Sequence, residues 1–350
     1  MFNFFSTSSL GVEINDFYLR AVLLEKRSKV IKLKKYNEVV LPKGVIENGE
    51  IQDAKKASEN LKKLINSIRK NGKINHQVIV TLPEEKTFTV LTDANKTVLD
   101  LKQNKKTDKI PQALCENVQE YIPFPLEDVY LDWKIVNNKI LLSAAPKLII
   151  NDYISLFKNN NIFLSHIDIK SAAILRSITS WSKDENKEKI IIYLGEVNSI
   201  IILGNNNVIE FSLSLPFANK TITDIIMKKL KLTKEQAQKA KKVCGLSDKN
   251  CHGAVKKILI PHLEEVIFNI KKILLFHQEN TKTSSSVNEI ILCGPGADLA
   301  GLNEFLFKKF KISIKIGNPL VNIYSQGKKN DFKKTPKFTV AIGAALRGLI

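Results

Sequence analysis

LGVEIND at residues 10–16 opens the part of the sequence that decides the fold, and YLRAVLLEK (18–26) and KVIKLKKYNEVVLP (29–42) follow it. These are apolar, β-branched runs separated by tight polar turns, a pattern typical of a three-stranded antiparallel meander. The same arrangement returns in KIIIYLGEV (189–197), SIIILGN (199–205) and NVIEFSLSLP (207–216). A duplicated meander followed each time by helical patterns predicts two related α/β lobes.

The segment between the two meanders predicts a smaller α+β unit. From Gln77 to Phe163 the pattern alternates as β-α-β-β-α, which we interpret as a subdomain inserted into the first lobe. We therefore expect a first lobe at 1–76 plus 164–186, an insert at 77–163 and a second lobe at 187–350. A helical subdomain is expected within the second lobe, at about 217–285.

Composition narrows the class of protein. The 350 residues carry 54 Lys+Arg against 35 Asp+Glu, a formal net charge of +19, and 44% are hydrophobic, which excludes a disordered chain. Thirteen lysines and five acidic residues lie between Lys220 and Lys272. A solvated surface, an anionic membrane surface and an acidic partner all fit this charge. Nucleic acid fits less well, because aromatic residues are not interleaved with the lysines as stacking platforms.

The number of cysteines and the length of the apolar runs indicate the cellular compartment of the protein. Four cysteines are too few for a disulfide scaffold, and no uncharged apolar run reaches the ~18 residues of a membrane span. The N-terminus lacks the basic region of a signal peptide. We therefore expect a cytoplasmic protein with reduced thiols.

Three turns are candidates for binding an anion. Cys293–Ala297 follows an apolar strand and is predicted to open a helix, where glycines and the helix N-terminus favour anions. It matches neither the P-loop nor the dinucleotide fingerprint. The two meander turns could hold phosphate through backbone amides, and their acidic residues suit a hydrated Mg²⁺. Ordinary connecting turns remain the alternative for all three.

Other constellations are weaker. Cys244, Cys251 and His252 lack the spacing of a zinc site, and His262 and His277 lie too far apart to chelate one ion together. We interpret both histidines as packing or surface residues. No Ser/His/Asp or Cys/His set stands out, so the sequence predicts neither a metal site nor catalytic residues.

The stretch YIPFPLEDVYLDW (121–133) resembles the hallmark segment of the type IV pilus assembly protein PilM family. Further segments resemble this family in the same order: LGVEINDFYLRAVLL, LLSAAPKLIINDYISLFKNNNI, IIIYLGEVNSIIIL, EIILCGPGADLAGL and FTVAIGAALRGL. The resemblance covers essentially the whole chain. It implies an actin-like ATPase fold related to FtsA, with two lobes of duplicated RNase H-like domains and an inserted α+β subdomain.

The resemblance also implies a nucleotide cleft, with ATP and magnesium as the candidate cofactor. The positions that match the family's site are Glu13, Asn15, Asp16, Gly195, Asn198, Ser199, Gln238, Lys241, Gly294, Pro295, Gly296 and Ala297. Several depart from the family pattern. Asp16 and Phe17 replace small hydroxyl residues, and Tyr193 replaces the aspartate that organises metal and water. Since phosphoryl transfer needs placed donors and a metal, we expect no hydrolysis.

The role implied is a cytoplasmic scaffold of the type IV pilus inner-membrane complex. Its partner would be the cytoplasmic N-terminal tail of a PilN-like membrane protein, bound between the first lobe and the insert by backbone hydrogen bonds and apolar pockets. A pilus motor ATPase, an anionic membrane surface and a homo-oligomeric ring are further candidate partners. Two alternatives stay open: a polymerising actin-like ATPase, and an adaptor of a related secretion or cell-division system.

Overall fold

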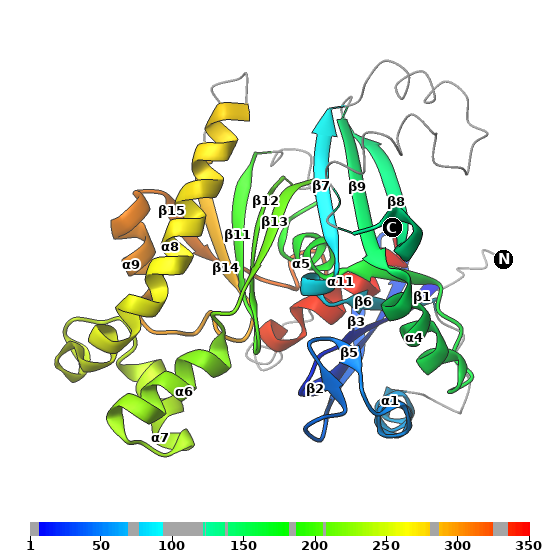
Figure 1. Ribbon diagram of the computed structural model, residues 1–350, viewed down its shortest axis with the longest axis horizontal. Coiled ribbons are helices and arrows are strands. Elements are labelled where there is room, and N and C mark those ends of the chain that lie inside the picture. Colours follow the sequence, from blue (N-terminus) through cyan, green and yellow to red (C-terminus); the bar gives the residue numbers. More distant parts are fainter. Residues whose placement is uncertain are drawn as a thin grey trace.

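The computed structural model describes residues 7–68, 77–93, 122, 124–136, 139–181, 187–205, 208–280, 287–324 and 335–350. Two mixed β-sheets form the centres of two lobes (Figure 1). Each lobe begins with a three-stranded antiparallel meander, as the sequence predicts.

The first sheet has the strand order β10-β6-β1-β2-β3. Its strands are β1 (Thr7–Ile14), β2 (Tyr18–Arg27), β3 (Val30–Val40), β6 (Gln77–Leu82) and β10 (His166–Ile169), and a small hairpin is formed by β4 (Ile46–Glu47) and β5 (Glu50–Ile51). Helix α1 (Ala54–Ile68) buries Leu61, Leu64, Ile65 and Ile68 against this sheet, because these side chains share one face at helical spacing. Helix α4 (Lys147–Lys158) packs into the same core.

The second sheet has the order β15-β14-β11-β12-β13-β7-β9-β8. Its strands are β7 (Phe88–Asp93), β8 (Val129–Val136), β9 (Lys139–Pro146), β11 (Lys189–Leu194), β12 (Ser199–Gly204), β13 (Ile209–Leu215), β14 (Glu289–Cys293) and β15 (Ser313–Ile316). One face is covered by α6 (Asn219–Leu230), α7 (Lys234–Val243), α8 (Ala254–Asn280) and α9 (Leu302–Phe310) (Figure 1). Thr233 caps α7 through a capping box with Gln236.

Helices α5 (Lys170–Ile178) and α11 (Thr339–Arg347) lie between the two sheets (Figure 1). Helix α5 packs on the second sheet and α11 packs on β1 and β2 of the first. The two helices cross in close contact, because a Cβ atom on Gly343 would lie 1.8 Å from the Ala173 carbonyl oxygen. This crossing joins the lobes and sets the distance between them.

Strand pairing and packing favour an insert smaller than the predicted 77–163. Strand β6 pairs with β1 and β10, and α4 packs into the first core, so both belong to the first lobe although they lie within 77–163. Strands β7, β9 and β8 continue the second sheet at its far end and have a core of their own. We propose that the inserted unit comprises 88–146 and that 77–82 and 147–158 are parts of the first lobe.

Two further expectations are corrected. Cys244, which follows α7, and Cys251 form a disulfide with their Cα atoms 5.6 Å apart, so reduced thiols were wrongly expected for this pair. The turn at Cys293–Ala297 does not open a helix, since α9 begins only at Leu302. Among the helices of the described part of the chain, none combines the length and the apolar character needed to cross a membrane.

Candidate functional site

The two meander turns, one from each lobe, face each other across the cleft between the sheets. They line a cavity of about 20 Å³, which is close to the space of one water molecule. Asn15, Asp16 and Asn198, which the sequence assigns to a nucleotide site, contribute to this lining together with Glu85, Lys170 and Glu196. The predicted turn residues therefore meet, but the space between them is nearly filled.

In the first turn, the Asp16 side chain is hydrogen-bonded to the backbone of the protein itself. The two carboxylate oxygens of Asp16 accept hydrogen bonds from the amides of Asn48 and Gly49, each at 3.0 Å. The Asn15 side chain accepts from the Phe17 amide at 3.2 Å. The Phe17 ring receives the ammonium group of Lys220 from the second lobe, 4.6 Å from its centroid. These contacts close the first turn toward the opposite lobe.

The second turn is also held by hydrogen bonds, here to the start of α6 and to Phe217. The carbonyls of Gly195 and Glu196 accept the amides of Asn219 and Lys220 at the start of α6. The Glu196 carboxylate accepts from the Asn219 side chain at 2.7 Å. The hydroxyl of Ser199 donates to the Phe217 carbonyl and is buried. None of these groups is directed at a ligand-sized space.

Tyr193 is packed closely against two glycines, which also lie near backbone carbonyls: a Cβ would be 2.3 Å from the Asn198 oxygen at Gly195 and 2.7 Å from the Leu194 oxygen at Gly294. Its buried ring would be 2.9 Å from a Cβ on Gly195 and 2.8 Å from one on Gly294. The ring therefore lies between the second turn and the Gly294–Ala297 turn. Gly294 has a φ of +86°, and the Gly296 amide donates to the Leu194 carbonyl at 2.9 Å. Burial, more than the nearby Glu13, raises the pKa of the Tyr193 hydroxyl well above its usual value.

On helix α7, the two residues assigned to the nucleotide site, Gln238 and Lys241, differ in burial. Gln238 is exposed. Lys241 is buried and donates to the Asn219 side chain, which in turn donates to Glu196. Burial lowers the pKa of the Lys241 ammonium group. Pro295 and Ala297 are half-buried.

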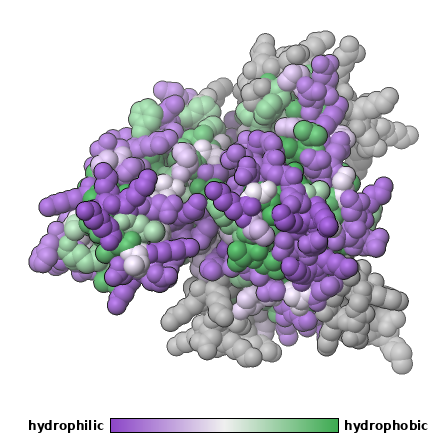
Figure 2. Space-filling model, turned by 60° about the horizontal axis from the view of Figure 1, so that its bottom comes forward, coloured by the Kyte–Doolittle hydropathy of each residue, from purple (hydrophilic) through white to green (hydrophobic). Residues whose placement is uncertain are grey.

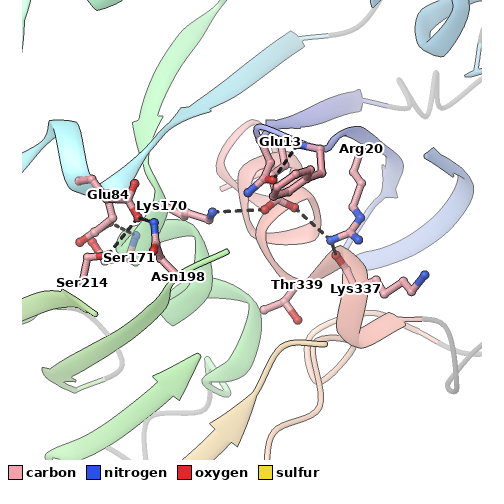
Figure 3. A network of polar contacts seen from close by, with 12 residues as sticks. Glu13, Arg20, Glu84, Lys170, Ser171, Asn198, Ser214, Lys337 and Thr339 are labelled. Atoms are coloured by element: carbon pink, nitrogen blue, oxygen red, sulfur yellow. Dashed lines mark hydrogen bonds and ion pairs between the residues drawn. The ribbon is translucent and has the colours of Figure 1, made fainter. Parts of the chain in front are cut away.

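A buried charged cluster lies behind the first turn, with Glu13 at its centre (Figure 3). Glu13 is fully buried, and its carboxylate lies 3.5 Å from the Lys170 ammonium group and 3.9 Å from the Arg20 guanidinium. Arg20 also pairs with Glu38 at 2.5 Å and donates to the Lys337 carbonyl at 2.7 Å. Glu13 thus lies between two cations of the protein itself.

Two acidic residues that the sequence analysis did not single out join the lobes. Glu84 and Glu85 form the turn η1 (Glu84–Lys86) directly after β6. The buried Glu84 accepts from the Ser171 amide at 2.9 Å and the Ser212 hydroxyl at 2.7 Å. Glu85 accepts from Asn198 at 2.5 Å and from Ser214 at 3.0 Å (Figure 3). We call Glu84 and Glu85 with these four partners the interlobe clasp.

The residues of the interlobe clasp are spread from position 84 to position 214, and the partners of the two glutamates are serines and an asparagine. No local sequence pattern therefore predicts these contacts. Burial is the main cause that raises the pKa of Glu84, while the Ser212 and Ser171 hydrogen bonds oppose that shift.

The residues of the cleft do not fit ATP with magnesium in this conformation. Pockets for ligands of such size measure roughly 300–1,000 Å³. The cavity here is far smaller, and Asp16, Glu85 and Glu196 would face the phosphates while Lys170 pairs with Glu13. The cleft therefore binds its two lobes together through direct contacts.

A much larger cavity, of about 1080 Å³, lies between the insert and the first lobe. One wall is β8, from Tyr130 to Lys134, and the opposite wall is formed by β10, α5 and the C-terminal residues. We call this cavity the β8 groove. Residues 130–133, a part of the hallmark segment that lies in β8, line this cavity.

The β8 groove combines apolar walls with a charged centre. Trp133, Trp181 and Ile150 are among its apolar lining residues. The buried Asp168 carboxylate accepts from Arg176 at 2.8 Å and from Arg347 at 2.7 Å. Arg176 also donates to the Gly343 carbonyl at 2.8 Å, and both arginines are lining residues of the groove.

Comparison with known proteins places this architecture in a class. The chain is similar to EutJ, an ethanolamine utilization protein of Carboxydothermus hydrogenoformans, with 11% identity, a TM-score of 0.55 and coverage of 97% of this chain and 89% of that one. It is also similar to MreB 5 of Spiroplasma citri bound to AMPPNP, with 12% identity, a TM-score of 0.53 and coverage of 97% and 95%. The fold is therefore the actin-like two-lobed α/β fold, and the predicted fold class is confirmed.

The family follows from two closer matches. The family model of type IV pilus assembly protein PilM matches residues 11–349. A solved PilM–PilN type IV pilus biogenesis complex is similar with a TM-score of 0.78, 19% identity and coverage of 98% of both chains. The chain belongs to the PilM family of type IV pilus assembly proteins.

Proposed function

We propose that this chain is a scaffold of the pilus inner-membrane assembly complex and that its β8 groove binds the cytoplasmic N-terminal tail of a PilN-like protein. The observation that carries the proposal is the groove beside β8, which is the last strand of the second sheet among the described residues. A strand at this position can pair with an added strand through its outer backbone groups. An extended tail can pair there and place alternate side chains against the apolar walls.

The charged centre of the groove would fix the orientation of the bound tail. Arg176 and Arg347 are held by Asp168 on one side and face the groove on the other. Such fixed guanidinium groups suit a carboxylate or a backbone carbonyl of the bound tail. We infer that the tail combines apolar anchors with one such acceptor.

Binding to a membrane protein's tail would hold the chain at the inner membrane from the cytoplasmic side. The face seen in Figure 2 is mostly hydrophilic, in keeping with the net charge of +19. We propose that this basic surface favours the anionic leaflet or acidic motor partners, and that several copies assemble into a ring.

We further propose that the cleft no longer uses nucleotide. The cavity of about 20 Å³, its three acidic lining residues and the Tyr193 ring between the turns support this. A polymerising ATPase would need open phosphate turns, so these features disfavour that alternative.

The test is a calorimetric titration of the full chain with a synthetic peptide covering the partner's N-terminal segment. Trp181→Ala removes a groove aromatic that is 38% exposed, and we expect it to weaken binding at least tenfold, about 1.4 kcal/mol. Phe163→Ala is the matched control, since Phe163 is 85% exposed and lies outside the groove lining. Equal affinity of wild type and Trp181→Ala, or equal losses in both variants, would refute the groove as the binding site.

A further inference from the structure

Three metal-binding side chains from distant parts of the chain converge in the second lobe. Glu188 directly precedes β11, Glu210 lies on β13, and His277 lies near the end of α8. One ligand atom from each lies within 4.8 Å of the other two. The Nε2 atom of His277 is 2.8 Å from the Glu188 carboxylate, and its Nδ1 atom is 3.5 Å from that of Glu210. We call these three residues the α8 cluster.

The α8 cluster is shielded from water. His277 is 2% exposed, and the side chains of Glu188 and Glu210 are 17% and 22% exposed. The two carboxylates and the imidazole are thus held close together in a largely buried place.

The three side chains are of the types that bind a divalent cation, and their ligand atoms are close enough to share one. Such an ion would neutralise both carboxylates at once and would take the imidazole nitrogen as a neutral ligand. The imidazole argues against Ca²⁺ and Mg²⁺, which prefer oxygen ligands alone, and favours a transition metal. One histidine with two carboxylates leaves a fourth tetrahedral position for water.

We propose that Glu188, Glu210 and His277 form a binding site for a divalent transition-metal ion, with Zn²⁺ as the ion that fits best. From the sequence, His277 is interpreted as a packing or surface residue. Glu188 and Glu210 lie far from it along the chain, so no spacing pattern indicates the cluster. This site is separate from the β8 groove and from the interlobe cleft.

The position of the site gives the metal a structural role. Phe211, next to Glu210, pairs with Val90 and so connects β13 to β7 of the insert. The ring of Phe211 also contacts that of Phe276, next to His277, at 6.1 Å between centroids. A bound ion would therefore fix the end of α8 to the sheet beside the junction between the second lobe and the insert.

The first experiment measures Zn²⁺ binding to the EDTA-treated full chain by competition with a chromophoric chelator. We expect the wild type to bind one ion that His277→Gln and Glu210→Gln each weaken at least tenfold. His262→Gln is the matched control, since His262 lies on the same helix but is exposed, and it should bind as the wild type does. Absence of Zn²⁺ binding, or variants that bind like the wild type, would overturn the proposal.

Thermal melts separate a metal site from a simple ion-pair cluster. In EDTA, Glu210→Gln removes carboxylate repulsion and should be at least as stable as the wild type. Added Zn²⁺ should raise the melting temperature of the wild type and of His262→Gln but not that of Glu210→Gln. If Glu210→Gln is destabilised in EDTA and Zn²⁺ changes nothing, the cluster is an imidazolium held between two carboxylates and the proposal fails.

Discussion

Glu84 in the interlobe clasp should make the protein lose stability as the pH rises, and Glu84→Gln should abolish that loss. Glu84 is 6% exposed, and burial raises the pKa of its carboxyl above the usual 4.5. The folded state therefore holds this proton more tightly than the unfolded chain does. The resulting stabilisation is complete below pH 4.5 and is lost as the pH rises through the folded-state pKa.

The magnitude follows from the linkage between pKa and stability. Each unit by which folding raises the pKa of Glu84 corresponds to about 1.4 kcal/mol of unfolding free energy lost across that pH window. Glutamine has nearly the same shape and keeps one oxygen, which can accept from the Ser171 amide, while the Ser212 hydroxyl can turn to accept from the new amide group. Its amide group adds a cost that does not vary with pH. The pH-dependent part of the difference between variant and wild type therefore isolates the buried carboxyl.

The assay is urea unfolding of wild type and Glu84→Gln at half-unit steps from pH 4 to pH 8. We expect the stability of the variant relative to the wild type to increase as the pH rises, because only the wild type loses the stabilisation of the buried, protonated carboxyl. Glu85→Gln, an exposed neighbour in the same turn, is the matched control for placing a glutamine there. A relative stability of Glu84→Gln that is flat or falls with rising pH would refute the reasoning.

Two further substitutions test the packing between helices and the capping of a helix. Gly343→Ala should destabilise the protein by about 3 kcal/mol or more, because its Cβ would lie 1.8 Å from the Ala173 oxygen at the crossing of α5 and α11; a melting temperature unchanged from wild type would contradict this crossing. Thr233→Ala should cost about 1 kcal/mol in urea unfolding, since it removes the capping box with Gln236 at the start of α7. Substitution of the next residue, Lys234→Ala, should be nearly neutral, and an equal loss in both variants would assign the effect to something other than the cap.

Local patterns in the sequence predict most of the fold. The two meanders are confirmed because each depends on residues close together in the chain, and the apolar stripe of α1 and the cap at Thr233 are local features of the same kind. The limits of the insert were harder to predict. The sequence of β6 is compatible with a strand of the insert or of the first lobe. Its pairing with β1 and β10 assigns it to the first lobe.

The state of the cleft could be predicted only in part. The replacement of an aspartate by Tyr193 indicated an altered site, but its ring position between two glycines depends on three-dimensional packing. The clasp and the α8 cluster were missed for the same reason. Glu84 meets Ser212, and His277 meets Glu188, through tertiary contacts that leave no spacing pattern in the sequence.

The most direct test of the central claim is calorimetry of the partner's N-terminal peptide binding to the full chain, with and without saturating ATP and Mg²⁺. A scaffold with a closed cleft should bind the peptide with the same affinity in both conditions, and ATP alone should give no heat of binding. A tenfold shift of peptide affinity by ATP, or micromolar ATP binding that depends on Mg²⁺, would show that the cleft opens to nucleotide and would contradict this account.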